Sequence, residues 1–177
     1  AGWLKKRLSL TDTDPARRRE AIQFVAEIIE IAAEFNAPAI IGSMQGQASD
    51  ITHRSESLGL LAEALGTLGG HAQRHGQVLL YEALNRYETN LLNTQEDAAN
   101  FLIKHSLVGK GVRLLCDLFH MNIEEQNVPE TITRLGRLGS GLIGHVHWAD
   151  SNRKAMGLGH TDSTALYRAL KAAGYDN

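Results

Sequence analysis

The sequence predicts an α/β protein in which parallel strands alternate with covering helices. Short apolar runs recur along the chain, and each is followed by a segment in which apolar residues return every three or four positions. The runs are continuously apolar rather than alternating, which is typical of parallel strands that have helices packed on them. No repeat, low-complexity segment or linker interrupts this order, so we expect one domain.

The expected elements begin with a helix at Pro15, because Asp14 is a suitable N-cap and proline is tolerated at the first helical position. Four strand–helix pairs follow it. We expect the strands at residues 38–44, 78–82, 112–117 and 142–148. We expect the helices of these pairs at residues 58–72, 94–105, 129 to between 136 and 141, and 163–173. Glycines in the first of them should weaken it by about 1 kcal/mol each relative to alanine; they are Gly66, Gly69 and Gly70.

Composition narrows the class of protein. The chain has 177 residues, a net charge of −2 and 43% hydrophobic residues, enough for a globular core. It has no long basic run for nucleic acid and no apolar run long enough to span a membrane, so we expect neither partner. Cys116 is the only cysteine, and we interpret it as a small buried hydrophobe. Without a disulfide or a visible signal peptide, we expect a cytoplasmic location.

Two architectures fit this order of elements: an open doubly wound sheet, or a segment of a (β/α)₈ TIM barrel. In both, the carboxyl ends of the strands lie on one rim. Ionisable residues stand where three successive strands are expected to end: Glu82, Asp117 and His147. Two carboxylates and one imidazole that converge there predict a site for one divalent metal ion. We expect Mn²⁺ first, with Mg²⁺, Co²⁺ or Zn²⁺ as alternatives.

Other polar residues near this rim have simpler interpretations. His145 faces the same side as His147 but lies two residues deeper along the strand, so we expect it in the core or hydrogen-bonded. Glu124 and Glu125 are expected to be solvated. Polar groups that follow the strand ends would suit a ligand with many hydroxyls; they occupy residues 85–88, 119–122 and 150–153. Three histidines in helices or loops are expected at the surface: His53, His71 and His75.

Three segments of the sequence resemble the sugar phosphate isomerase/epimerase superfamily of xylose isomerase-like TIM barrels: LYEALNRYETNLLNT, LLCDLFHMNIEE and GHVHWADSNRKAMGLGHTD. They contain the motifs E-x-x-N-R-x-E, D-x-F-H-M-N-I-E-E and H-x-x-x-x-N-R in the family's order and spacing. Within the superfamily, the chain is most similar to the ketose 3-epimerases (tagatose and psicose epimerases) and the hydroxypyruvate isomerases. The resemblance implies a (β/α)₈ barrel with one divalent metal.

The resemblance also implies a role for each rim residue. It implies that Glu82, Asp117 and His147 bind the metal, and that Glu82 is one of two catalytic acid/base carboxylates. It implies that three further residues bind the substrate oxygens: Glu88, His120 and Arg153. The expected enzyme isomerises or epimerises a ketose or sugar phosphate, by proton transfer at a carbon next to the carbonyl through an enediolate. The expected partner is this small sugar, with a homo-oligomer as a further expectation.

Two departures from the family pattern affect these expectations. The loop after Arg153 has Ala155-Met156-Gly157 where the family usually has proline before glycine, which would alter substrate preference. The family's second catalytic glutamate follows a turn similar to G-Y-D-G, whereas this chain reads Gly174-Tyr175-Asp176-Asn177 and stops. We therefore expect residues 1–177 to be a single partial barrel of about four βα units, without the first strands and the last strand. The chain alone should turn over little.

Two other functions remain open at this point. An endonuclease IV-like metal-dependent phosphodiesterase would share the barrel and the metal chemistry. It would need more histidine and carboxylate ligands and a basic face for DNA, which the net charge of −2 disfavours. A non-catalytic sugar-binding barrel is supported only by the missing glutamate.

Overall fold

The computed structural model describes residues 2, 6–139 and 141–176. Its strands are β1 (Ala39–Ile41), β2 (Leu79–Glu82), β3 (Val112–Asp117) and β4 (Ile143–His147). Its helices are α2 (Pro15–Glu34), α3 (Arg54–Arg74), α4 (Gln95–Lys104), α5 (Leu118–Glu124), α6 (Val128–Leu138) and α7 (Ser163–Ala172). Short 3₁₀ turns are η1 (Ser43–Gln45) and η2 (Val108–Lys110).

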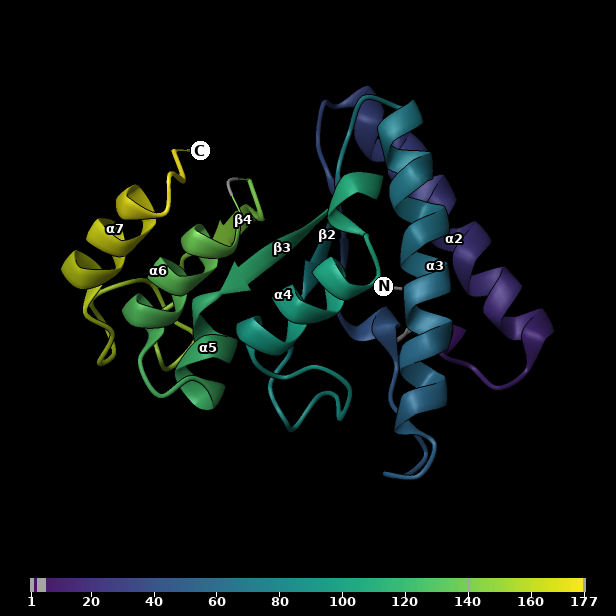
Figure 1. Cartoon of the computed structure of the whole chain (residues 1–177), viewed down its shortest axis with the longest axis horizontal. Coiled ribbons are helices and arrows are strands. Elements are labelled where there is room, and N and C mark those ends of the chain that lie inside the picture. Colours follow the sequence, from purple (N-terminus) through teal and green to yellow (C-terminus); the bar gives the residue numbers. More distant parts are fainter. Residues whose placement is uncertain (1, 3–5, 140, 177) are drawn as a thin grey trace.

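The strands form one parallel sheet in the order β1-β2-β3-β4, which confirms the predicted α/β class (Figure 1). Each strand lies beside its predecessor, and no reversal of order occurs among the described strands. Right-handed crossovers in such a sheet place successive helices on the same side. Leu79 and Tyr81 accordingly belong to the core cluster shared with the helices, while Leu80 and Glu82 alternate to the other face. This arrangement is that of a barrel segment.

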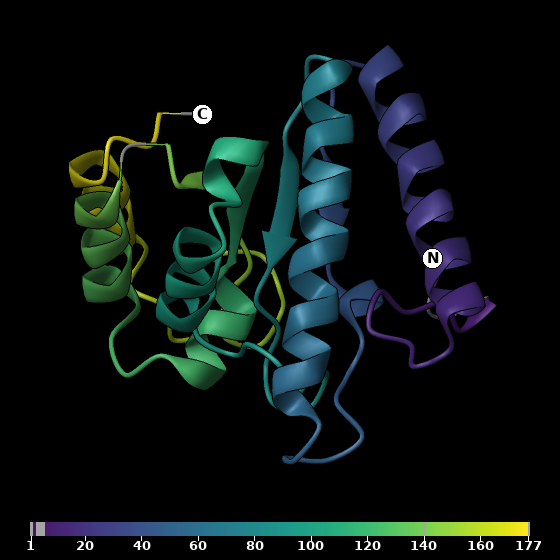
Figure 2. The same cartoon turned by 45° about the vertical axis from the view of Figure 1, so that its right-hand side comes forward.

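Two helices begin where the sequence predicts them to start. The predicted cap Asp14 accepts a hydrogen bond from the backbone N–H of Ala16 at the start of α2, and Thr94, where the next helix was expected to begin, accepts one from the backbone N–H of Asp97 at the start of α4. Helices α2 and α3 run side by side (Figure 2) and bury apolar residues such as Val25 between them and the sheet. Among the described helices, none combines the length and the hydropathy needed to cross a membrane.

Two expected elements differ from the observed bounds by three or four residues at one end, the others by about one or two, and the helix α5 was not predicted. The strand expected at 38–44 ends at Ile41, because the chain turns at Gly42 into η1. Helix α3 begins at Arg54, four residues earlier than expected. Helix α5 follows β3 without a loop, since Asp117 ends the strand and caps the helix at once. Its buried residues Leu118 and Met121 anchor it to the core.

Gly69 shows why α3 tolerates glycine in its interior. A Cβ at this position would lie 2.4 Å from the carbonyl oxygen of Lys110 and 2.6 Å from Val112 Cγ2. The turn η2 can therefore approach the helix only because residue 69 has no side chain. The cost in helix propensity that the sequence predicts is offset by this close packing against the start of β3.

Candidate active site

The ends of three strands bring the predicted metal ligands together. Glu82 ends β2, Asp117 ends β3 and His147 ends β4. His147 Nδ1 lies 3.0 Å from Asp117 Oδ2 and 3.8 Å from Glu82 Oε1. These three side chains therefore meet at one point on the carboxyl rim of the sheet, where barrel enzymes carry their catalytic groups. Their assignment as metal ligands stays a prediction.

The two oxygens of Asp117 have different surroundings. Oδ1 accepts hydrogen bonds from the backbone N–H groups of Phe119, at 2.9 Å, and His120, at 3.4 Å, as the N-cap of α5. These bonds fix the orientation of the carboxylate. Oδ2 is left facing His147, at 3.0 Å. One residue thus ends a strand, starts a helix and presents one oriented oxygen to the rim.

Glu82 is held in an environment that opposes its ionisation. Its pKa is raised to about 8, first by burial and then by the negative charges of Asp117 and Glu88, while Arg153 opposes the shift. The backbone of Glu82 is held separately: Gln45 Nε2 donates to the Glu82 backbone carbonyl at 3.0 Å, and the Tyr81 hydroxyl donates to Gln45 Oε1 at 2.6 Å. The backbone at the end of β2 is therefore fixed while its carboxylate faces the rim.

The carboxylate pair suits a cation. Ligand atoms of Glu82, Asp117 and His120 all lie within 4.8 Å of one another. At that separation, two negative charges repel by about 3 kcal/mol for an effective dielectric constant of about 20. A bound divalent ion would remove this repulsion and let Glu82 ionise fully. Two carboxylates with imidazole nearby form a donor set that fits such an ion.

Two imidazoles flank the pair, and their hydrogen bonds distinguish them. His120 is buried, and its Nδ1 accepts from the backbone N–H of Asn85 at 3.2 Å and faces the Asn85 Nδ2 amide at 2.8 Å. The backbone donor requires the proton on Nε2, which lies 3.8 Å from Glu82 Oε1. A protonated Nε2 is a hydrogen-bond donor and cannot bind a metal. This tautomer favours His147, whose Nδ1 faces both carboxylates, as the nitrogen ligand.

The three residues expected to bind substrate also lie together. Glu88 Oε1 is 4.0 Å from His120 Nδ1 and 3.8 Å from Arg153 Nη1. The guanidinium carbon of Arg153 lies 4.8 Å from the centre of the Phe119 ring, a cation–π contact that positions it over the rim. The sequence placed Asn85 and Phe119 only within the polar segments that follow the strand ends. It did not predict that Asn85 fixes His120 or that Phe119 lies against Arg153.

Asp150 organises the loop that carries Arg153, instead of forming part of a ligand-binding rim. It is fully buried, and its oxygens accept from the backbone N–H groups of Ser151, Gly157, Gly159 and Thr161 at 2.7–3.0 Å. Burial alone would raise the pKa of Asp150, but these backbone hydrogen bonds outweigh it and hold the pKa well below its usual range. The loop is therefore built around one buried carboxylate.

The expectation that Glu124 and Glu125 are solvated is wrong. Glu124 has a side chain only 6% exposed and accepts from the backbone N–H, Nε and Nη2 of Arg86. Glu125 accepts from the backbone N–H of Gln95 at 2.7 Å and from the Thr131 hydroxyl at 3.1 Å. Both carboxylates satisfy donors of neighbouring segments, so they fix the loop after β2 and the starts of α4 and α6.

The expectation for His145 is also wrong. His145 does face the same side as His147, with the two rings edge to face at 5.4 Å between centroids, but it is exposed. An irregularity in the β3–β4 pairing, between Leu114 and Leu115, leaves Gly144 without a partner and turns His145 away from the helices. The helices do not cover that face of β4, so depth along the strand does not bury the side chain.

Gly42→Ala should impair the site without unfolding the protein. A Cβ at this position would lie 2.5 Å from Glu82 Oε2, so the flexible carboxylate must move away from the rim. A displacement of about 1 Å at a catalytic group costs about 100-fold in rate, and we expect a loss of this size with little change in melting temperature. Gly59→Ala is the matched control, because its Cβ would meet nothing within 4 Å. Equal catalytic rates of the two variants would contradict the assignment of the Glu82 carboxylate to the active site.

Asp150→Asn should weaken substrate binding while metal content is unchanged. The amide NH₂ cannot accept hydrogen bonds, so the two backbone donors that share one Asp150 oxygen, for example Gly157 and Gly159 on Oδ2, lose their partner. The loop that positions Arg153 then loosens. We expect KM to rise about tenfold or more and kcat to change less. Asp162→Asn, at the exposed cap of α7, is the control. An unchanged KM would show that this loop does not position the substrate.

Parallel strands in sequential order, with ionisable side chains at their carboxyl ends, are typical of (β/α)₈ barrels. The model of the family described as Xylose isomerase-like TIM barrel matches residues 3–177, and the chain belongs to this family. The resemblance inferred from the sequence motifs and the predicted fold class are thereby confirmed.

Several relatives of this chain are named as sugar epimerases. It is 32% identical over 167 residues to the 3-dehydro-D-guloside 4-epimerase of Escherichia coli (strain K12), covering 90% of this chain and 62% of that protein. It is 30% identical over 172 residues to the L-ribulose 3-epimerase of Mesorhizobium japonicum, a match that covers 94% of this chain and 54% of that protein. The solved structure of D-allulose 3-epimerase from Methylomonas sp. in complex with D-allulose superposes on this chain with a TM-score of 0.84 at 26% identity. The match covers 97% of this chain and 58% of that one. The chain thus spans between 54% and 62% of the length of the two curated relatives.

Proposed function

We propose that the protein containing this chain is a metal-dependent sugar epimerase or isomerase that acts on a ketose or a related keto sugar, free or phosphorylated. The observation that carries the proposal is the buried Glu82 carboxylate, which lies among Asp117, His120 and His147 on the carboxyl rim. A base at such a position can take a proton from a carbon next to a carbonyl. The names of the relatives support a sugar as the substrate.

Each of the rim residues would have a different role in such a reaction. Glu82, Asp117 and His147 would hold a divalent ion, preferably Mn²⁺, which when bound supplies positive charge next to the substrate oxygens. Glu82 removes the proton, and the electrons move onto the carbonyl oxygen to form an enediolate. His120 Nε2–H donates to a substrate oxygen. Glu88 and Arg153 bind hydroxyl groups and fix which carbon faces Glu82. A second acid that returns a proton to the opposite face of the enediolate gives an epimer, whereas return of the proton to the neighbouring carbon gives an isomer.

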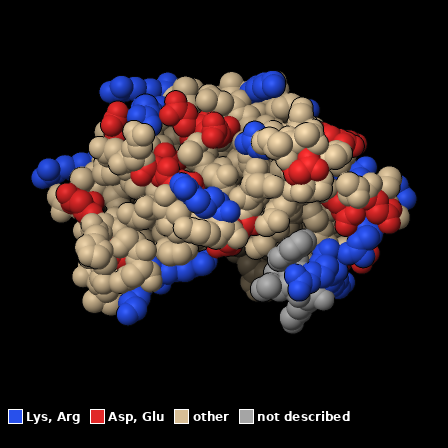
Figure 3. Space-filling model, turned by 90° about the horizontal axis from the view of Figure 1, so that it is seen from below, with Lys and Arg blue, Asp and Glu red and all other residues tan. Residues whose placement is uncertain are grey.

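The alternative of a DNA phosphodiesterase is less well supported. Such an enzyme needs a continuous basic surface for the phosphate backbone. On the face drawn in Figure 3, acidic and basic side chains are interspersed over the described residues. The two carboxylates and two imidazoles at the rim also provide fewer ligands than a metal cluster needs.

Exchange with solvent tests the proposal directly. The protein containing this chain is incubated with a ketose such as D-fructose or D-psicose in deuterated water with Mn²⁺, and the sugar is examined by NMR. We expect deuterium at a carbon next to the carbonyl, since a carboxylate base exchanges its proton with solvent. Exchange should stop after chelation and return when Mn²⁺ is added. Interconversion of sugars with the original hydrogen retained would show a hydride shift and contradict the proposal, as would the absence of any reaction across ketoses and their phosphates.

A further inference from the structure

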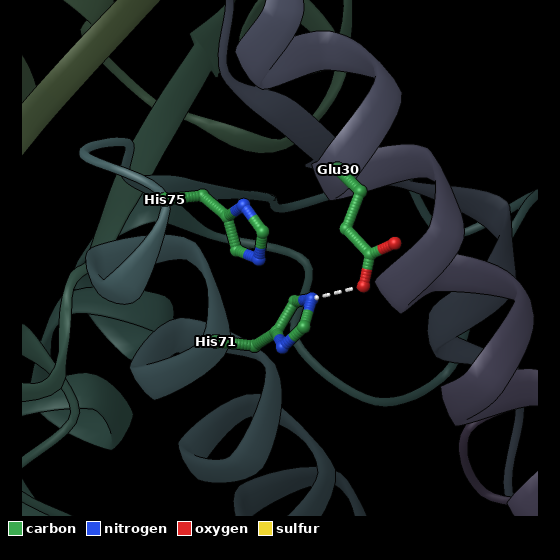
Figure 4. Close-up of side chains that lie close together, drawn as sticks. All are labelled: Glu30, His71 and His75. Atoms are coloured by element: carbon green, nitrogen blue, oxygen red, sulfur yellow. Dashed lines mark hydrogen bonds and ion pairs between the residues drawn. The ribbon is translucent and has the colours of Figure 1, made fainter.

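A second group of metal-binding side chains lies away from the rim, between helices α2 and α3. Glu30 projects from α2, His71 from the last turns of α3, and His75 caps the C-terminal end of α3 (Figure 4). One potential ligand atom from each lies within 4.8 Å of the other two. His71 Nε2 is 3.0 Å from Glu30 Oε1, and the two imidazole rings lie 4.7 Å apart.

The backbone explains why these groups meet. His71 and His75 are four residues apart, so they lie one above the other on the same helix face. Helix α2 packs along α3 and brings Glu30 against that face. The His71 side chain is only 19% exposed, so its ring is already oriented by packing. The site therefore joins two helices, with one ligand from α2 and two from α3.

We propose that Glu30, His71 and His75 form a second metal site, which binds Zn²⁺ between helices α2 and α3. Two imidazole nitrogens and one carboxylate oxygen are a donor set that zinc uses in proteins, with water in the fourth position. Bonds of about 2.0–2.1 Å to a tetrahedral ion place ligand atoms about 3.4 Å apart. The present separations approach this, so only small movements of the side chains are required.

The position of the site indicates a structural role. Helices α2 and α3 end just before β1 and β2, so their C-terminal ends lie near the amino ends of the strands. Glu82 and Asp117 lie at the opposite, carboxyl ends. In barrels, the amino end of the sheet contributes to stability and not to catalysis. Zinc at this place would clamp the two helices together without contacting substrate.

Arg74 competes with the metal. Its Nη2 lies 3.2 Å from His71 Nδ1 and, as a guanidinium donor, requires Nδ1 to be the acceptor and the His71 proton to be on Nε2, facing Glu30. Zinc binding at Nε2 displaces that proton, and Nδ1 then carries hydrogen. Arg74 must therefore move away. Arg74→Gln removes the competing charge and offers an oxygen that can accept from Nδ1–H, so it should bind zinc about tenfold more tightly.

Counting bound zinc tests the site. The protein containing this chain is dialysed against Zn²⁺ near neutral pH, and the bound metal is measured together with the melting temperature. His71→Gln and His75→Gln should each lose one equivalent of zinc and the accompanying rise in melting temperature. The matched control is His53→Gln, at the other end of α3, where the histidine pairs with Asp50 outside the cluster. The His53→Gln variant should retain that equivalent.

The outcomes separate the proposal from its alternatives. All three side chains reach the surface, so the variants should fold, and circular dichroism without metal checks this. Loss of one equivalent in both cluster variants, together with tighter binding in Arg74→Gln, supports the site. The same zinc content in His75→Gln as in the wild type would overturn it. Equal loss of zinc in His53→Gln would also overturn it, because that result would mean general binding to surface histidines.

Discussion

Glu82→Gln should lower the rate of deuterium exchange by about 10²–10⁴-fold. The amide cannot take a proton, and general base catalysis contributes an effect of this size. The exchange is measured by NMR on the sugar in deuterated water, and the metal content is measured on the same sample, because an amide is also a weaker metal ligand. Retained metal with lost exchange would identify Glu82 as the base.

A surface carboxylate provides the control for this substitution. Glu63 lies on the exposed side of α3, and the Glu63→Gln variant should catalyse deuterium exchange at the wild-type rate. If Glu82→Gln lost its metal, Asp117→Asn would be compared, since it removes a ligand but keeps the base. Exchange at the wild-type rate in Glu82→Gln would show that another residue removes the proton.

Arg153→Ala should raise KM by about 10- to 150-fold, while the bound metal stays unchanged. Arg153 lies against Glu88 and over the Phe119 ring, where its guanidinium can donate to substrate oxygens. A hydrogen bond from a charged group contributes about 1.5–3 kcal/mol, which corresponds to that range of KM. Steady-state kinetics and metal analysis of the same preparation measure both quantities.

Arg153→Lys is the informative companion variant. Lysine keeps the charge but loses the planar group that stacks on Phe119 and donates two hydrogen bonds. We expect it to recover only part of the affinity. Loss of metal in Arg153→Ala would contradict its assignment to the substrate, and full recovery in Arg153→Lys would show that only the charge matters.

The linear pattern of residues determined the parallel α/β class, the cap of α2 and the residues at the strand ends. These features are local: an apolar run, a cap such as Asp14, or a carboxylate at the end of a strand such as Asp117 depends only on its neighbours in the chain. The motifs around Glu82, Asp117 and His147 also carried the resemblance to the family to which the chain belongs. The sequence predicted that these three residues lie together, because each ends one of three successive parallel strands and such strands end on one rim.

Contacts between segments far apart in the sequence decided the rest. The tautomer of His120 depends on the backbone N–H of Asn85, and the burial of Glu124 depends on Arg86. The exposure of His145 depends on which face of β4 the helices leave uncovered. The grouping of Glu30 with His71 and His75 depends on how α2 packs against α3, and neither helix contains the whole set. Local patterns cannot specify such partners, because they are fixed only when tertiary packing sets the distance between the elements.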